Sequence, residues 1–332
     1  MTPTNSVALL FFRVLADPRG RPAALLLECG AGDHGALAAA IGAGVDNFVA
    51  LSAAMPCLFR HDALAAPLAE ALQQQRWRAL APAAVCRVDQ RLVIDALPAA
   101  IAWLDGDWCM TPPPTATGAQ AASRATALQM VQLVADDADT HAIEALLRRD
   151  PALSYNLLRL VNSIGVGGGR RITSFSQALL LLGRGQLRRW LNLMLFAARQ
   201  GDIRSTMLLA RVAMRARALE LLAKVHGLDK LHQEQAFMTG MFSLLGVLFG
   251  MTVAEVLAPL CLGEAVHAAL LRREGELGIL LSLIEALEQG DLAGAAVRLD
   301  ALQIARADFN DAIIDAALWM QGALQESQAA HG

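Results

Sequence analysis

The spacing of hydrophobic and polar residues changes near residue 110, and this change divides the chain into two regions. Before it, short apolar runs alternate with turn-forming residues, which is typical of strands mixed with a few helices. The strands expected there are residues 7–12, 24–27, 48–51, 85–88 and 91–94, the last two as a hairpin. The helices expected there are residues 36–41 and 62–75. We therefore predict that residues 1–110 form a small mixed α/β domain.

From residue 124 onward, apolar residues recur every three or four positions, which places them on one face of a helix. The expected helices are residues 125–134, 141–148, 154–161, 174–182, 185–198, 202–226, 231–249, 253–260, 263–271, 278–288, 291–305 and 309–324. Short connections join them, so residues 124–325 are predicted to form a compact multi-helix bundle. The predicted fold class is mainly α, with a small α/β domain before the bundle.

Residues 111–123 are predicted to be a linker between the two regions. Pro112, Pro113 and Pro114 favour an extended chain, and the threonines and glycine around them favour turns and coil. Such a segment makes few packing contacts and is open to proteases. We therefore place the domain boundary here, and the bundle from residue 124 onward is expected to fold without the N-terminal region.

Residues 147–190 carry the most specific pattern of the chain. Asp150 and Pro151 suit the start of a helix, because aspartate accepts from free N–H groups and proline has none to leave unpaired. The glycines that end this helix are Gly165, Gly167, Gly168 and Gly169. Ser174 is in position to cap the next helix. The segment therefore predicts two amphipathic helices around a glycine-rich turn.

This arrangement resembles the HDOD domain, an all-helical relative of the HD-type metal-dependent phosphohydrolases. The resemblance rests on residues 150–153, 157–163, 172–174, 177–178, 182–183 and 187–188. It extends over residues 124–325 and implies a bacterial signalling protein. Some HDOD proteins also carry an N-terminal EAL domain, a cyclic di-GMP phosphodiesterase barrel. Residues 1–110 are too short for a complete barrel, so the resemblance implies at most a degenerate EAL remnant there.

Catalytic HD domains hold a divalent metal with an adjacent His-Asp pair on a helix. In the corresponding segment of this chain, residues 236–246, Ser243 and Leu244 stand where that pair would be. Serine and leucine cannot replace an imidazole and a carboxylate as metal ligands. His61-Asp62 lies far outside the helical region and is interpreted as a helix start with an early acid. We therefore expect no catalytic residues, no metal, no other cofactor and no enzymatic activity.

Positive charge gathers in one part of a chain whose net charge is −3. Residues 148–217 contain 13 arginines but only two acids, Asp150 and Asp202. Clustered guanidinium groups suit the recognition of phosphates and carboxylates. The residues predicted to form a partner- or anion-binding surface are Arg170, Arg171, Arg184, Arg188 and Arg189. The alternative is that these arginines form a solvated helix face.

The expected function is that of a non-enzymatic signal-transduction regulator, whose HDOD domain binds a protein with an acidic surface. One alternative is a sensor of a cyclic dinucleotide or another phosphate ligand, bound by the arginine-rich half. The other is a residual metal-dependent phosphohydrolase. Nucleic acid is not an expected partner, because aromatic residues make up only 5% of the chain.

The remaining sequence features favour a cytoplasmic protein. Five scattered cysteines without a CxxC motif indicate reduced thiols. The first residues lack the pattern of a secretory signal. Residues 235–254 carry no charge, but three glycines interrupt them, so we interpret them as a buried helix rather than a membrane span.

Overall fold

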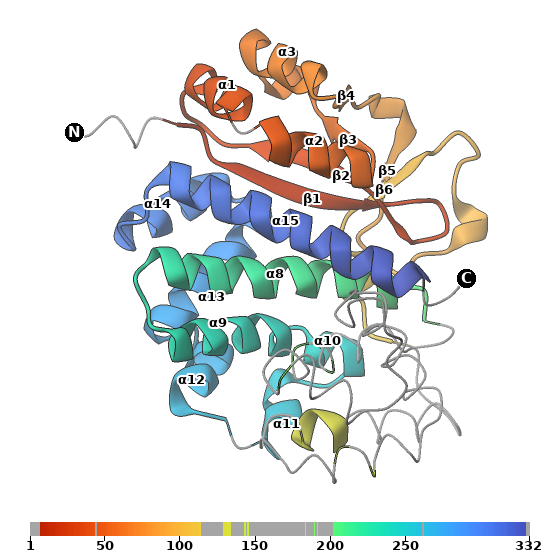
Figure 1. Ribbon diagram of the computed structural model, residues 1–332. Helices are drawn as coiled ribbons and strands as arrows, with labels where there is room; N and C mark the ends of the chain where they lie inside the picture. The colour runs from red at the N-terminus through yellow and green to blue at the C-terminus, as the bar shows by residue number, and fades with distance from the viewer. Residues whose placement is uncertain are drawn as a thin grey trace.

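The computed structural model describes residues 7–43, 45–113, 129–133, 143, 145, 183, 189, 191, 202–260 and 262–329. Within these residues, the N-terminal region forms a six-stranded sheet with helices, and the C-terminal region is helical (Figure 1). The predicted fold class, a multi-helix region preceded by a small α/β domain, is therefore confirmed.

The sheet is open and mixed, with the strand order β4-β3-β2-β1-β6-β5. Its strands are β1 (Leu10–Ala16), β2 (Pro22–Cys29), β3 (Cys57–Phe59), β4 (Arg78–Ala79), β5 (Val85–Arg87) and β6 (Trp103–Asp105). β1 runs antiparallel to β2 and to β6, whereas the other neighbours are parallel. Most residues of β1 and β2 are buried, which explains their nearly continuous apolar sequence.

Three helices accompany the sheet: α1 (His34–Ala43), α2 (Val45–Ala54) and α3 (Ala66–Gln74). The prediction of a strand over residues 48–51 is wrong, because this run lies in α2. Phe48 and Leu51 are buried while Val49 and Ala50 are exposed, so the run has one helical face in the core. A short apolar run alone does not distinguish a strand from such a face.

The predicted hairpin of residues 85–88 and 91–94 is also wrong. β5 pairs instead with β6, in parallel, and residues 91–93 have no regular structure. β6 is only three residues long, so its sequence gave little sign of a strand. Leu92 is buried even so, which explains the apolar pattern that suggested a strand.

The described helices from residue 202 onward are α8 (Ser205–Val225), α9 (Lys230–Phe242), α10 (Leu245–Phe249), α11 (Val253–Leu257), α12 (Glu264–Arg272), α13 (Gly275–Glu288), α14 (Leu292–Ala301) and α15 (Arg306–Ala329). Asp229, Thr252 and Asp291 accept backbone N–H groups at the starts of α9, α11 and α14. The helices expected from residue 202 onward are confirmed, except that the one over residues 231–249 is broken into α9 and α10. Most of the helices expected between residues 125 and 198 lie outside the described residues. Residues 129–133 are described, and they are helical as expected.

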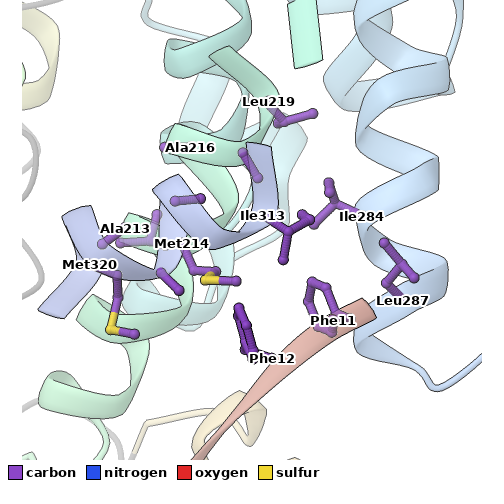
Figure 2. Close-up of a cluster of buried hydrophobic side chains, with 14 of the residues drawn as sticks. Phe11, Phe12, Ala213, Met214, Ala216, Leu219, Ile284, Leu287, Ile313 and Met320 are labelled. Atoms are coloured by element: carbon purple, nitrogen blue, oxygen red, sulfur yellow. The ribbon is translucent and has the colours of Figure 1, made fainter. Parts of the chain in front are cut away.

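Helix α15 lies between the sheet and α8 (Figure 1). It contacts α8 on one side and α2 and β1 on the other. Figure 2 shows Phe11 and Phe12 of β1 in the same buried cluster as Ile313 and Met320 of α15 and side chains from α8 and α13. One hydrophobic core therefore includes residues from both regions of the chain.

Two buried polar side chains of α15 also bind the backbone of the N-terminal region. The Asn310 side chain accepts from Leu10 N and donates to Ala8 O, both at 3.0 Å. Gln321 donates to Leu51 O at 3.0 Å. The amide of Asn310 thus satisfies a donor and an acceptor at the start of β1, where no strand partner does so.

The described start of the predicted linker is held against the helical region. The guanidinium of Arg204 donates to Thr111 O. Gly250, in the left-handed conformation at the end of α10, lies so close to Pro113 that a Cβ would be 2.8 Å from its ring. The boundary at residues 111–123 stays a prediction, but these contacts and the common core argue that the two regions fold together.

We expect Asn310→Ala to lower the free energy of unfolding by about 2–4 kcal/mol, because it leaves two buried backbone groups without partners. Urea unfolding of the full chain would measure the loss. Asn47→Ala, at an exposed position of α2, is the matched control and should change stability by less than about 0.5 kcal/mol. Equal effects of the two substitutions would show that Asn310 does not anchor β1.

We further expect a fragment of residues 124–325 to aggregate or to melt well below the full chain. Removing the N-terminal region exposes the apolar side of α15 that packs on β1 and α2. Size-exclusion chromatography and thermal melts followed by circular dichroism would measure this. A soluble, helical, monomeric fragment would instead support two separately folding domains.

Candidate functional site

Ser243 and Leu244, which the sequence comparison with HD domains aligned with the metal dyad, form the break between α9 and α10. Both are buried. One turn earlier, a Cβ on Gly240 would lie 2.5 Å from the Cα of Ala216 on α8. The two helix backbones therefore touch at this crossing, which only glycine allows. The crossing brings Ser243 within reach of the side chain that precedes Ala216 on α8.

That residue is Arg215, whose guanidinium binds two helices at once. Its Nη1 donates to Ser243 Oγ at 2.7 Å, and Ser243 Oγ donates to Gly240 O at 2.7 Å. Its Nε donates to Glu288 Oε1 at 3.0 Å, and its Nη2 donates to Glu288 Oε2. Arg215 of α8 thus forms a two-point ion pair with α13 and a hydrogen bond with the end of α9.

The Arg215 guanidinium is almost fully buried, with 4% of the side chain exposed. Burial disfavours its charge, but the nearby Glu288 carboxylate outweighs this and raises the pKa of Arg215 above its usual value. The side chain therefore remains a cation inside the protein. Removing either partner of such a pair would leave a buried charge without compensation.

Glu285 extends this charge cluster to α12. Its Oε1 lies 3.8 Å from Arg215 Nη1. Both of its oxygens also accept from Arg273, each at 2.8 Å. Arg273 ends α12 in the left-handed conformation, and its guanidinium donates to Ala269 O and Leu270 O of that helix. The carboxylates of α13 are thus already engaged by arginines.

Arg211, one turn before Arg215, links α8 to the N-terminal region. Its Nη1 lies 2.8 Å from Asp107 Oδ1, and its Nη2 donates to Gly106 O at 2.9 Å. Gly106 has φ +108° and no room for a Cβ, which would meet Val88 O at 2.4 Å. The turn after β6 can therefore reach Arg211 only because a glycine is present there.

A pocket of about 230 Å³ opens beside these charges. It is lined by Asp107, Met110, Arg211, Arg215, Ser243, Leu244, Val247, Glu285, Glu288 and Gln289. Asp107 and Met110 come from the N-terminal region, so both regions of the chain form its wall. Its volume is below the usual range for pockets that hold drug-sized ligands. The pocket therefore suits only a small molecule.

A divalent metal does not fit at the Ser243-Leu244 position. A metal there would meet the guanidinium of Arg215, a positive charge, 2.7 Å from Ser243 Oγ. The nearest carboxylates, those of Glu285 and Glu288, are held by arginines. Among the described residues, no three or more histidines, cysteines, aspartates or glutamates come together in a metal-binding group. The donor set thus lacks free ligands for a hard cation.

Arg189 belongs to the predicted partner-binding surface, but its guanidinium already has partners inside the bundle. Its Nη1 donates to Glu220 Oε2 at 3.0 Å, and its Nη2 donates to Oε1 of the same residue. The guanidinium also lies over the Phe237 ring, 4.5 Å from its centre. The side chain is 16% exposed. Arg170, Arg171, Arg184 and Arg188 lie outside the described residues, so a binding surface on them stays a prediction.

The four described cysteines are free and form no disulfide with one another. Burial, with a smaller effect of Glu28, raises the pKa of Cys29 to about 11. Burial raises the pKa of Cys57 to about 12. His34 Nε2 lies 3.6 Å from Cys29 Sγ, but its Nδ1 accepts from Ala65 N, so Nε2 carries the hydrogen. This imidazole cannot take a proton from the thiol.

The comparison with protein families assigns the first part of the helical region. Residues 121–264 match the model of the HDOD domain. The chain carries an HDOD domain. Arg211, Arg215 and Ser243 lie within the matched residues, whereas Glu285 and Glu288 follow them. The HDOD resemblance inferred from the sequence is therefore confirmed for residues 121–264, and its predicted extension to residue 325 stays a prediction.

Two curated relatives share part of this chain. The cyclic di-GMP phosphodiesterase CdgJ of Vibrio cholerae serotype O1 is 36% identical over 185 residues, which are 56% of this chain and 42% of CdgJ. The uncharacterized protein YuxH of Bacillus subtilis strain 168 is 29% identical over 147 residues, which are 44% of this chain and 36% of YuxH. The HDOD chain thus matches less than half the length of either relative.

Among solved structures, a candidate phosphohydrolase from Shewanella amazonensis SB2B aligns with 61% of this chain and 93% of its own. The TM-score is 0.43 and the sequence identity is 15%. Within the described part of the HDOD chain, no single helix is long and apolar enough to cross a membrane. The pair α1 and α2, bent by 85°, meets the same criteria of length and composition only when taken together.

Proposed function

We propose that this HDOD protein is a signalling regulator that acts by binding and not by catalysis. The observation that carries the proposal is the Arg215 guanidinium, which donates to Ser243 Oγ at the position of the metal dyad. Metal-dependent hydrolysis needs a metal ion to activate water and to polarise the phosphoryl group. A guanidinium has no empty coordination position and offers no acceptor for the proton of water.

The carboxylates around the pocket support the same conclusion. A general base needs a carboxylate or imidazole that can accept a proton from water. Glu285, Glu288 and Asp107 each form an ion pair with an arginine. In each pair, a carboxylate oxygen already lies against a guanidinium group, which leaves it less available to a water molecule. The described wall of the pocket thus supplies neither a metal site nor an effective base.

The relatives suggest the pathway in which the regulator acts. CdgJ is named as a cyclic di-GMP phosphodiesterase, and this chain matches 42% of it. We therefore place this protein in cyclic di-GMP-related signalling, in the cytoplasm, as a chain that binds a partner. The proposed partner is a protein with an acidic surface that docks on Arg170, Arg171, Arg184 and Arg188. Electrostatic attraction would speed that encounter.

The purified full chain is expected to hold no stoichiometric divalent metal and to hydrolyse neither cyclic di-GMP nor phosphomonoesters above the rate in buffer. The physical reason is the cation at residue 215 together with the engaged carboxylates. Elemental analysis after dialysis against Mn²⁺, and chromatography of the reaction mixture, would test this. A catalytic HD phosphodiesterase in the same assay is the control. A stoichiometric metal ion or steady product formation would contradict the proposal.

The second candidate is a sensor that binds cyclic di-GMP without cleaving it, and the name of CdgJ favours it. The described pocket does not suit this dianion, because three carboxylates face two guanidinium groups in its wall. The ligand would have to bind the arginine-rich segment instead. This candidate therefore concerns Arg170, Arg171, Arg184 and Arg188.

Calorimetry with cyclic di-GMP separates the two candidates. If the protein is a sensor, cyclic di-GMP should bind to it, and this binding should weaken as the salt concentration rises. It should be lost in an Arg184→Glu, Arg188→Glu double variant. The regulator with a protein partner predicts no binding of the nucleotide. It also predicts that the same double variant captures less partner from the native cell at an unchanged melting temperature. Nucleotide binding that the double variant retains would exclude the arginine-rich segment as the sensor site.

A further inference from the structure

We propose that the space around the Arg215 guanidinium is a cation site, which the chain fills with its own side chain and which joins α8, α9 and α13. The proposal does not depend on the proposed function, because it concerns what holds the helices and not what they bind. The ligands of the site are Ser243 Oγ and the carboxylate of Glu288, with Glu285 beside them.

Charge and shape both define the site. Glu288 accepts from Nε and Nη2 of the same guanidinium, which requires a flat, forked cation. Ser243 Oγ accepts from the third nitrogen, Nη1, and passes its own hydrogen to Gly240 O. All three guanidinium nitrogens are therefore engaged by fixed oxygens. A spherical ion or an ammonium group cannot match this planar arrangement.

The site is open to solution on one side. Arg215, Ser243, Glu285 and Glu288 all line the 230 Å³ pocket. If the side chain of Arg215 is shortened, the pocket extends to the space that the guanidinium had filled. Free guanidinium, a cation of the same shape, can then enter from the pocket and meet the same oxygens. The site thus becomes a binding site for a small planar cation.

The cation site also affects the N-terminal region through Arg211. Arg211 lies one turn from Arg215 on α8, and it holds Gly106 and Asp107 of the turn after β6. Without the charge of Arg215, the uncompensated Glu288 attracts Arg211, the nearest remaining cation on this face of α8. Arg211 would then release the turn. We therefore expect the backbone after β6 to exchange hydrogen faster when the site is empty.

The experiment uses Arg215→Ala in the full chain. The melting temperature should fall on the order of 10 °C, because the partly buried Glu288 is left without its partner. Addition of about 10 mM guanidinium chloride, far below denaturing concentrations, should restore at least half of this loss by binding the folded state. Equal concentrations of sodium and tetramethylammonium chloride should not. Amide exchange over residues 105–110 should rise in the variant and fall again with guanidinium.

Two controls separate a cation site from general destabilisation. Arg215→Ala with Glu288→Gln removes the carboxylate and should show no rescue by guanidinium. Arg272→Ala removes a half-exposed arginine that pairs with Glu264 and Glu274, and should change neither stability nor the guanidinium response. Rescue that persists without Glu288, or absence of rescue in the single variant, would overturn the proposal.

A second pair of variants covers the case in which Arg215→Ala does not fold. Arg215→Lys keeps a positive charge without the fork, and Arg215→Met keeps the apolar stem without charge. The proposal predicts that the lysine variant melts above the methionine variant and below the natural chain. A methionine variant as stable as the lysine variant would show that packing, and not a cation, holds the three helices.

Discussion

The burial of α15 on two opposite sides is the constraint on which the rest of the structure depends. The exposed acids Asp308, Asp311 and Asp315 lie on one side of it, and most other side chains from residue 309 to residue 324 are buried. α8 covers one side, and β1 with α2 covers the other. Neither region alone hides this helix from water. The sheet is therefore held at a fixed place relative to α8, and the turn after β6 can lie over Arg211.

Helix α8 also holds charged side chains in the interior of the protein. Arg211 and Arg215 occupy one face of the helix, but they serve different partners. The first binds the N-terminal region, and the second binds α9 and α13. Arg189 and Arg217 share Glu220 in a similar way. Among the described arginines of the basic segment, Arg211 and Arg215 thus pair with acids from distant parts of the chain. Arg204 and Arg217 pair with acids only two and three positions away.

The sequence predicted the helices and strands that depend on the local spacing of apolar residues. It did not predict the contacts between residues far apart in the chain. The long helices and the strands near residues 7–12 and 24–27 follow from hydrophobic periodicity and turn residues. Residues 48–51 were predicted as a strand, because four apolar residues fit either element. The ion pair of Arg215 with Glu288 joins residues 73 positions apart, and no local pattern indicates it. The HDOD resemblance identified Ser243, but it gave no sign that an arginine would lie against it.

The contact between Gly240 and Ala216 also bears on how this domain evolves. The helices touch there, so little space separates Ser243 from α8. A mutation of Ser243 to histidine would place an imidazole in that space against a positive charge. Loss of Arg215 alone would leave Glu288 unpaired. Replacing the cluster around Arg215 by metal ligands would therefore need several changes at once, because each single change leaves a charged group without its partner. Evolution would thus have to exchange the residues of this cluster together rather than one by one.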